Sequence, residues 1–241
     1  MGILQTTLAS IFPPRCLGCG DLVDSDFGLC GACWSETDFV GGTVCDMCGT
    51  PLPGVSENGP IHCDSCLSSP KSWAQGRAAL VYGGMGRKLI LGLKHGDRQE
   101  IARPAAGWMR LSSKSVLNKT TIIAPVPLHW IRLVKRRYNQ SALIAKNLAE
   151  LSGLDWCPDL LHRSKNTPSL DGKTQQQRTE ILSDAVRINA KRRHRIIGRP
   201  VLLIDDVMTT GATLDACATV CRAAGAGQVC VSVLARAVKA T

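Results

Sequence analysis

The residues best suited to chemistry are two adjacent aspartates, Asp205 and Asp206, which follow the apolar run Val201–Ile204. Small and hydroxyl-bearing residues come next: Thr209, Thr210, Gly211, Ala212 and Thr213. A strand that leads through such a loop into a helix turns backbone N–H groups toward the helix N-terminus, which suits a phosphate group. Adjacent carboxylates repel each other, so a ligand or cation is expected beside them. We therefore predict a site for a phosphorylated sugar, whose hydroxyls the two aspartates would hold.

A second group of reactive residues lies near the start of the chain, where eight of the twelve cysteines form four CxxC pairs: Cys16/Cys19, Cys30/Cys33, Cys45/Cys48 and Cys63/Cys66. Two such knuckles supply the four thiolates of a tetrahedral Zn²⁺ site that leaves no open position for catalysis. We predict two structural zinc ions, with disulfides or an iron–sulfur cluster as alternatives. Pairing of successive knuckles is the simplest arrangement, although the spacing also allows interleaved pairs.

Charge divides the chain in the same way as cysteine. Residues 1–70 contain one basic and eight acidic residues, whereas residues 71–241 contain 28 basic and 11 acidic residues. The net charges are −7 and +17, so a basic face for a polyanion belongs to the second part. We predict two domains, residues 1–70 and residues 71–241, with the boundary in the polar stretch Ser68–Ser72.

The composition excludes several classes of protein. A hydrophobic content of 44% allows a globular core, and the chain has no low-complexity tract typical of a disordered protein. No apolar stretch approaches the length of a membrane span, and the N-terminus lacks the features of a secretory signal. The protein is expected to be soluble and cytoplasmic, with no membrane span.

The elements that must position these residues alternate between strand and helix. Apolar runs predict strands at 78–82, 121–126, 200–204 and 228–234, and helical patterns cover residues 86–93, 139–151 and 213–224. This order is typical of an α/β fold with a central, mostly parallel sheet and right-handed crossovers. Ligands of such sheets bind beyond the carboxyl ends of the strands, which is where Asp205 and Asp206 fall.

The stretch Val201–Thr213 (VLLIDDVMTTGAT) resembles the motif with which type I phosphoribosyltransferases bind 5-phosphoribosyl-1-pyrophosphate (PRPP). With four CxxC knuckles ahead of it, the whole chain resembles the ComF family of bacterial competence-associated proteins. The resemblance continues through several further residues and segments: Tyr82, Arg87, Lys94, Pro125–His129 and Arg137–Gln140.

The resemblance implies a type I phosphoribosyltransferase fold preceded by a small Cys-rich zinc-ribbon domain. It also implies that Asp205 and Asp206 hold the ribose hydroxyls, with either of them a candidate catalytic base, and that Thr209–Thr213 cradle the 5-phosphate. Leu128 and His129 lie where such enzymes bind the pyrophosphate, and Mg²⁺ accompanies PRPP. A plain turn is the alternative for Leu128 and His129.

Residues 163–181 resemble the active-site lid of the family, but Leu170 and Ile181 depart from its usual Gln and Asn. The function implied is phosphoribosyl transfer in DNA uptake, natural transformation, DNA utilisation or nucleotide metabolism. The alternative is a module that senses PRPP or a nucleotide, or binds single-stranded DNA, without catalysis. The basic run Arg132, Lys135, Arg136 and Arg137 fits either polyanion, and the solvated face of a helix is the alternative. The expected partners are therefore PRPP or a related phosphoribosyl ligand, and single-stranded DNA or proteins of competence and recombination.

Overall fold

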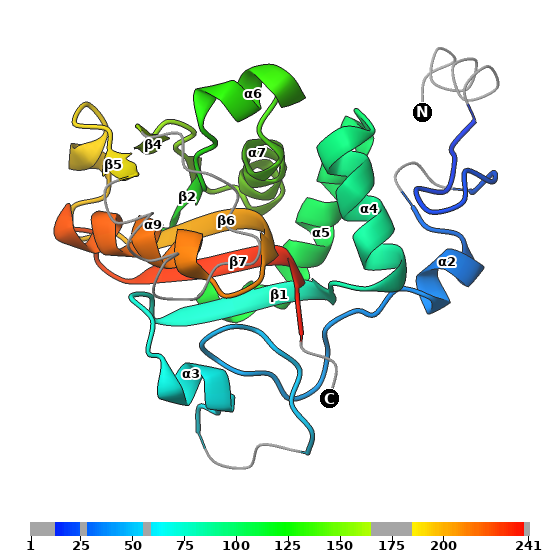
Figure 1. Cartoon of the computed structure of the whole chain (residues 1–241), viewed down its shortest axis with the longest axis horizontal. Coiled ribbons are helices and arrows are strands. Elements are labelled where there is room, and N and C mark those ends of the chain that lie inside the picture. Colours follow the sequence, from blue (N-terminus) through cyan, green and yellow to red (C-terminus); the bar gives the residue numbers. More distant parts are fainter. Residues whose placement is uncertain (1–12, 25–27, 55–58, 165–184, 239–241) are drawn as a thin grey trace.

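A five-stranded sheet forms the centre of the computed structural model, which describes residues 13–24, 28–54, 59–164 and 185–238 (Figure 1). Every pair of neighbouring strands in this sheet is parallel, in the order β1-β7-β6-β2-β3. The strands are β1 (Gln75–Val81), β2 (Ile122–Pro125), β3 (Asp155–Trp156), β6 (Val201–Met208) and β7 (Val229–Arg236). Strands β4 (Leu161–Arg163) and β5 (Val186–Ile188) form a separate antiparallel pair.

Helices cover both faces of the sheet (Figure 1). On one face lie α4 (Gly84–His95), α5 (Ala102–Ser112) and α7 (Gln140–Ser152), whose buried side chains form one cluster with Leu202 and Ile204 of β6. On the other face lies α9 (Ala212–Ala223), which packs on Val201 and Leu203. Successive residues of β6 therefore enter opposite halves of the core, as the period of two in a strand requires.

The remaining elements are short. Helices α2 (Gly31–Ser35) and α3 (Asp64–Ser68) belong to the Cys-rich unit, and α6 (Trp130–Arg136) follows β2. Single 3₁₀ turns occur at η1 (Gln99–Ile101), η2 (Lys114–Val116) and η3 (Arg193–Arg195).

The helix that contacts the acidic pair, α7, has sharp ends for local reasons. The Asn139 side chain accepts hydrogen bonds from the N–H groups of Ser141 and Ala142, which caps the first turn. At the other end Gly153 adopts a φ of +63°, the left-handed conformation that favours glycine. The Asn139 amide also donates to the carbonyl of Val126 at 3.0 Å, which ties the helix start to the end of β2.

The Cys-rich unit lies along the outer edge of β1 (Figure 1). Residues 38–40 bond to this edge: Val40 donates to Ala79 at 2.9 Å, and Val81 donates to Asp38 at 2.8 Å. Further along, the N–H of Gly76 donates to the carbonyl of Asp46 at 2.8 Å. The backbone groups of an edge strand, which would otherwise be open to pairing with another chain, are thus satisfied internally.

The predicted α/β class with a parallel sheet, preceded by a Cys-rich unit, is confirmed. The predicted division at residue 70 stays a prediction. No helix among the described residues is long and apolar enough to cross a membrane. The predicted lid lies, from residue 165 onward, outside the described residues.

Candidate ligand site and two metal centres

The acidic pair lies where β6 runs past the end of its neighbour. Strand β2 stops at Pro125, opposite Ile204, so from Asp205 onward β6 is paired only with β7. The strand continues through the carboxylates to Met208, four residues beyond the predicted end at Ile204. Asp205 and Asp206 therefore project from a rigid strand at the carboxyl edge of the sheet, where ligands of parallel sheets bind.

The two carboxylates have different partners. The Oδ1 atom of Asp205 accepts hydrogen bonds from the Ser141 hydroxyl and from the N–H of Asp206, both at 2.9 Å. Asp206 is 8% exposed, and its Oδ1 forms an ion pair with the Lys94 Nζ of α4 at 3.0 Å. Residues distant in sequence thus converge on the pair from two helices.

The surroundings of Asp205 raise the pKa of its carboxyl group toward neutral pH. Burial raises its pKa to about 7, and the negative charge of Asp206 acts in the same direction. The Ser141 hydroxyl, the N–H of Asp206 and the Lys94 charge oppose this rise. A partly protonated Asp205 relieves part of the repulsion between the adjacent acids, and a bound cation would shift Asp205 toward the carboxylate.

The predicted phosphate loop connects β6 with α9. Thr209 is exposed, Thr210 is partly buried, and Ala212 and Thr213 form the first turn of α9. Gly211 precedes the helix with a φ of +79° and offers no side chain to cap it. A carbon added at Gly211 would also lie 2.8 Å from Cη2 of Trp73, so glycine is required here for both conformation and space.

Leu128 and His129 lie in the connection from β2 to α6. His129 is 4% exposed, and its Nδ1 accepts a hydrogen bond from the N–H of Ile131 at 3.3 Å. The imidazole therefore caps α6, while Leu128 is partly buried. The end of β2 reaches the acidic pair through a chain of hydrogen bonds: Val126 to Asn139, Asn139 to Ser141, and Ser141 to Asp205.

Sequence reasoning missed two residues that organise the site. Ser141 sits in the first turn of α7, and only the fold brings it to Asp205. Arg236 ends β7, is 9% exposed, and donates through Nη1 to the carbonyls of Met208 (3.0 Å) and Thr209. A single arginine at the end of the apolar run VCVSVLAR was the available signal for the second.

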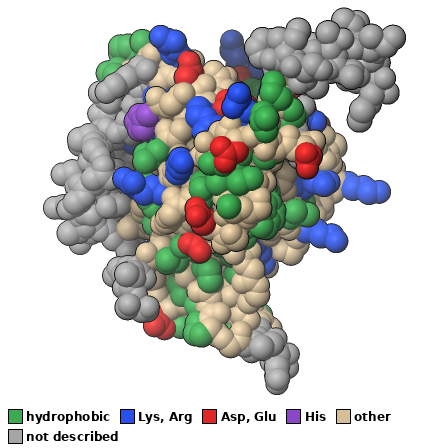
Figure 2. Space-filling view, turned by 90° about the vertical axis from the view of Figure 1, so that its right-hand side faces the viewer, with side chains coloured by type: hydrophobic (Ala, Val, Ile, Leu, Met, Phe, Trp, Pro, Cys, Tyr) green, Lys and Arg blue, Asp and Glu red, His purple; other side chains and the backbone are tan. Residues whose placement is uncertain are grey.

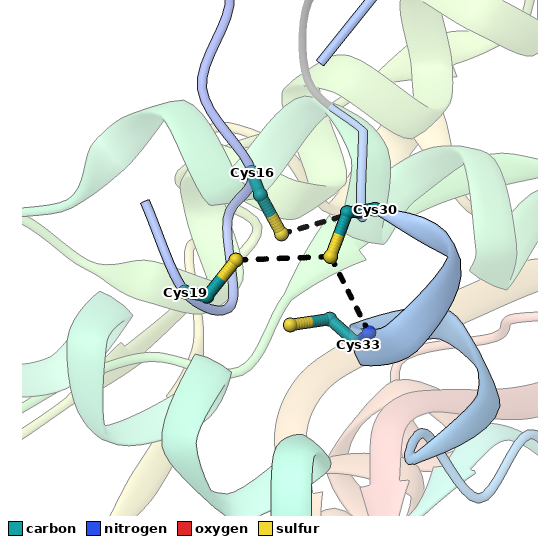
Figure 3. A group of neighbouring side chains, drawn as sticks. All are labelled: Cys16, Cys19, Cys30 and Cys33. Carbon is teal, nitrogen blue, oxygen red and sulfur yellow. Dashed lines mark hydrogen bonds between the residues drawn. The ribbon is translucent and has the colours of Figure 1, made fainter. Parts of the chain in front are cut away.

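The first four cysteines form one metal centre (Figure 3). The sulfurs of Cys16, Cys19, Cys30 and Cys33 all lie within 4.8 Å of one another, and Cys19 and Cys30 are 3.7 Å apart. Four sulfurs around Zn²⁺ at about 2.3 Å are separated by about 3.8 Å, so the spacing fits this ion. The N–H groups of Gly18 and Cys30 donate to the Cys16 sulfur at 3.3 and 3.2 Å.

The second centre repeats the first. The sulfurs of Cys45, Cys48, Cys63 and Cys66 meet the same distance limit, with 3.7 Å between Cys48 and Cys63. The N–H of Cys63 donates to the Cys45 sulfur at 3.3 Å, as that of Cys30 does to Cys16. In both centres a glycine with positive φ follows the first knuckle, Gly20 at +87° and Gly49 at +70°.

These distances decide the pairing of the knuckles. Successive CxxC pairs share a centre, whereas the interleaved arrangement is not the one adopted. All eight sulfurs are free thiols in the structure rather than disulfides. The two four-cysteine sites fit two structural zinc ions.

The positive charge of Arg236, which bonds to the loop after β6, affects the Cys48 thiol of the second centre. The pKa of the Cys48 thiol is lowered to about 3, with its hydrogen bond to Cys45 as the largest cause. The Thr50 hydroxyl, 3.1 Å from the sulfur, and the positive charge of Arg236 act in the same direction. Arg236 also donates to the carbonyl of Thr209, in the loop that follows β6.

Comparisons with known proteins found a family model for the Cys-rich part and relatives that match most of the chain. A family model described as a double zinc ribbon domain matches residues 7–67. Competence protein F of Haemophilus influenzae is 28% identical over 95% of this chain and 100% of its own length. The DNA utilization protein YhgH of Escherichia coli is 27% identical (87% of this chain, 91% of that protein). Competence protein ComFC of Bacillus subtilis is 26% identical (80% and 77%).

Solved structures match more distantly. An adenine phosphoribosyltransferase from Thermoanaerobacter pseudethanolicus has a TM-score of 0.40 at 16% identity and covers 62% of this chain and 73% of that one. A glutamine PRPP amidotransferase from B. subtilis has a TM-score of 0.39 at 18% identity, with 60% and 30% covered. The sequence relatives carry the conclusion: the chain is similar over most of its length to competence protein F and the DNA utilization proteins, which confirms the resemblance to the ComF family.

Proposed function

We propose that the protein binds PRPP, or a closely related phosphoribosyl ligand, together with Mg²⁺. One observation carries the proposal: two acidic side chains leave the open carboxyl end of β6, and a loop of small and hydroxyl residues leads from them into α9. A sugar with vicinal hydroxyls and a terminal phosphate has the spacing of polar groups that such an arrangement can hold. The sequence of this stretch supports the same ligand, because it resembles the PRPP motif.

In this proposal Asp205 and Asp206 accept hydrogen bonds from the ribose hydroxyls, and the N–H groups and hydroxyls of Thr209–Thr213 hold the 5-phosphate. Leu128 and His129, in the connection from β2 to α6, are proposed to contact the pyrophosphate. The donor set suits Mg²⁺, which prefers oxygen ligands and keeps several waters. When bound, this ion neutralises charge on the pyrophosphate.

If the site turns over, the reaction is phosphoribosyl transfer. The bond between ribose C1 and the pyrophosphate oxygen breaks, and the electron pair leaves with pyrophosphate. A nucleophile forms the new bond at C1 and loses its proton to a base, for which Asp205, with a pKa of about 7, is suited. The Asp206 carboxylate, which pairs with Lys94, stabilises positive charge that develops on the sugar.

The relatives suggest the process that such binding serves. Two of them are named as competence proteins and another as a DNA utilization protein. We place this protein in DNA uptake, natural transformation, DNA utilisation or the nucleotide metabolism connected with them.

Calorimetric titration with PRPP, in the presence and absence of Mg²⁺, tests the proposal. We expect saturable binding that requires Mg²⁺ and is lost when Asp205→Asn and Asp206→Asn are combined. Asp155→Asn is the matched control, because Asp155 pairs with Arg199 at the opposite, amino end of the sheet. Unchanged affinity in the double variant, or no binding by the wild-type protein, would refute the assignment.

A second candidate function, binding of single-stranded DNA, is favoured by the surface of α6. Four apolar side chains of this short helix are exposed, including Trp130 (65%) and Val134 (72%), and Arg137 follows them. An exposed indole beside cations can stack on a base and contact phosphates. On the face shown in Figure 2, acidic, basic and apolar side chains are interspersed rather than gathered into a basic patch.

Fluorescence titration with a labelled oligonucleotide separates the two functions. DNA binding through several phosphates falls at least about tenfold between about 50 and 200 mM salt, and Trp130→Ala would weaken it. Leu111→Ala, which removes an exposed apolar side chain from α5, is the control. Undetectable binding at low salt would eliminate this candidate.

A further inference from the structure

The second four-cysteine site lies against the loop that follows β6, and a single indole connects them. Trp73 is 3% exposed, and its Nε1 donates to the carbonyl of Met47, between Cys45 and Cys48, at 2.6 Å. The other end of the ring, at Cη2, abuts Gly211, where an added carbon would lie 2.8 Å away. A rigid side chain thus spans from the metal knuckle to the start of α9.

Arg236 makes a second connection. Its Nη1 lies within hydrogen-bond distance of the carbonyls of Met208, Thr209 and Ala237, which fixes the backbone as it leaves β6. The buried Nε atom has no hydrogen-bond partner among the described residues, so the guanidinium uses only part of its hydrogen-bonding capacity.

The segment between the knuckle and β1 ties the same parts together. The N–H of Ser72 donates to Asp215 in the first turn of α9 at 2.7 Å. On the other side Arg77 forms an ion pair with Asp46 of the knuckle at 2.8 Å. Residues 72–77 are therefore bonded both to the second metal centre and to the helix that the loop enters.

We propose that the second four-cysteine site positions the loop Thr209–Thr213, so that an ion in this site and a phosphoribosyl ligand in the loop stabilise each other. Loss of the ion frees the knuckle, and with it the carbonyl that holds Trp73. The indole then no longer fixes Gly211. Because two ligands that favour one conformation raise each other's affinity equally, the effect runs in both directions. The part that concerns the ligand rests on the proposed function, whereas the positioning of the loop does not.

The first four-cysteine site provides an internal contrast. It packs against α4: Gly18 lies beside Cys33 and Met85 at the start of this helix, and Arg98, beyond the end of the helix, donates to the carbonyl of Leu17 at 2.9 Å. Its Cys30 corresponds to Cys63 of the second site, since each is half-buried and precedes the short helix of its knuckle. Removing one thiolate from either position is thus a matched pair of changes.

Hydrogen exchange of Cys63→Ser and Cys30→Ser proteins tests the positioning. Elemental analysis should give about one zinc ion per chain in each variant. Amides of residues 209–213 should exchange at least about tenfold faster in Cys63→Ser than in wild-type protein and change little in Cys30→Ser. Equal effects of the two variants, or none in either, would overturn the proposal.

Trp73→Phe keeps the test decisive if Cys63→Ser does not fold. This change keeps an apolar ring, but it removes the bond to Met47 and the ring edge at Gly211. We expect two retained zinc ions and faster exchange of the same amides. If the Trp73→Phe protein keeps both ions and these amides exchange as slowly as in wild-type protein, the indole does not couple the loop to the knuckle.

The reciprocal effect is measured by zinc release to a chromophoric chelator. In Cys30→Ser protein, whose ion is in the second site, PRPP with Mg²⁺ should slow release at least about fivefold; in Cys63→Ser protein it should not. If wild-type protein binds no PRPP by calorimetry, the proposed function fails, and the exchange result still decides whether the second site positions the loop. Binding of PRPP without any slowing would contradict the coupling alone.

Discussion

Two neighbouring carboxylates at the end of β6 are stabilised by different means. Asp206 forms an ion pair with Lys94, whereas Asp205 is hydrogen-bonded to Ser141 and has a pKa raised to about 7 by burial and by the charge of Asp206. Ligand-binding and catalytic sites often contain such pairs. Two adjacent acids that suit a ligand lower the stability of the protein when no ligand is bound. The effect of this pair on the free energy of unfolding of the ligand-free protein can be measured.

Asp205→Asn should stabilise the protein at alkaline pH. The folded state keeps a proton on Asp205 up to about pH 7, whereas the unfolded chain releases it near 3.8, so stability falls as pH rises between these values. The amide cannot ionise, and we expect the free energy of unfolding at pH 8 to rise by about 1–3 kcal/mol. Urea unfolding at pH 4 and pH 8 measures this, and a difference from wild type that does not grow with pH would contradict it.

Lys94→Met should destabilise the protein, because it leaves Asp206 buried without its counter-ion. We expect a loss of about 1–3 kcal/mol in the free energy of unfolding, most of which disappears when Asp206→Asn is present as well. Lys88→Met, an exposed position on the same helix, is the control. Equal effects of Lys94→Met with and without Asp206→Asn would show that the pair contributes nothing.

At the scale of elements, the entry into α9 depends on one glycine. Gly211→Ala forces a side chain into a left-handed conformation and against Trp73, and we expect it to cost about 1–3 kcal/mol and to weaken PRPP binding. Gly107→Ala lies within α5 with open space around it and should stabilise the protein by about 0.5–1 kcal/mol. Thermal unfolding of both variants tests this, and equal melting temperatures would contradict it.

The elements that the sequence predicts well are those whose pattern matches their burial. The strands near 121–126, 200–204 and 228–234 and the helix at 139–151 appear close to their expected places because they bury continuous or periodic apolar faces. Helix α6 was not predicted, since its apolar residues face outward and carry no period. Strand β3 has only two residues, too few for any pattern.

The candidate site was predictable where it is contiguous in the chain. The run from Val201 to Thr213 contains its own signal, and the spacing of the cysteines predicts the two metal sites. The contacts of Lys94, Ser141 and Arg236 depend on helices and strands distant in sequence, so only tertiary structure reveals them.

At the scale of the whole molecule, the metal sites should support more than their own loops. The Cys-rich unit bonds to the outer edge of β1, and all its metal-site cysteines except the exposed Cys19 belong to the same clusters of side chains as the sheet and the helices. We expect about two zinc ions per chain by elemental analysis, and a chelator should lower the melting temperature and promote aggregation through the uncovered edge. Cys157→Ala, outside both centres, should retain two ions. A melting temperature that the chelator leaves unchanged would contradict this role.

The strand order has a consequence for folding during synthesis on the ribosome. Strand β7 follows the other described strands of the sheet in the chain, yet it lies between β1 and β6. When synthesis has reached residue 228, β1 and β6 have both been made, but the strand that joins them has not. Strand β1, with the Cys-rich unit on its outer edge, can therefore join the rest of the sheet only after residues 229–236 have been made, and a chain that ends before them lacks the link between β1 and β6.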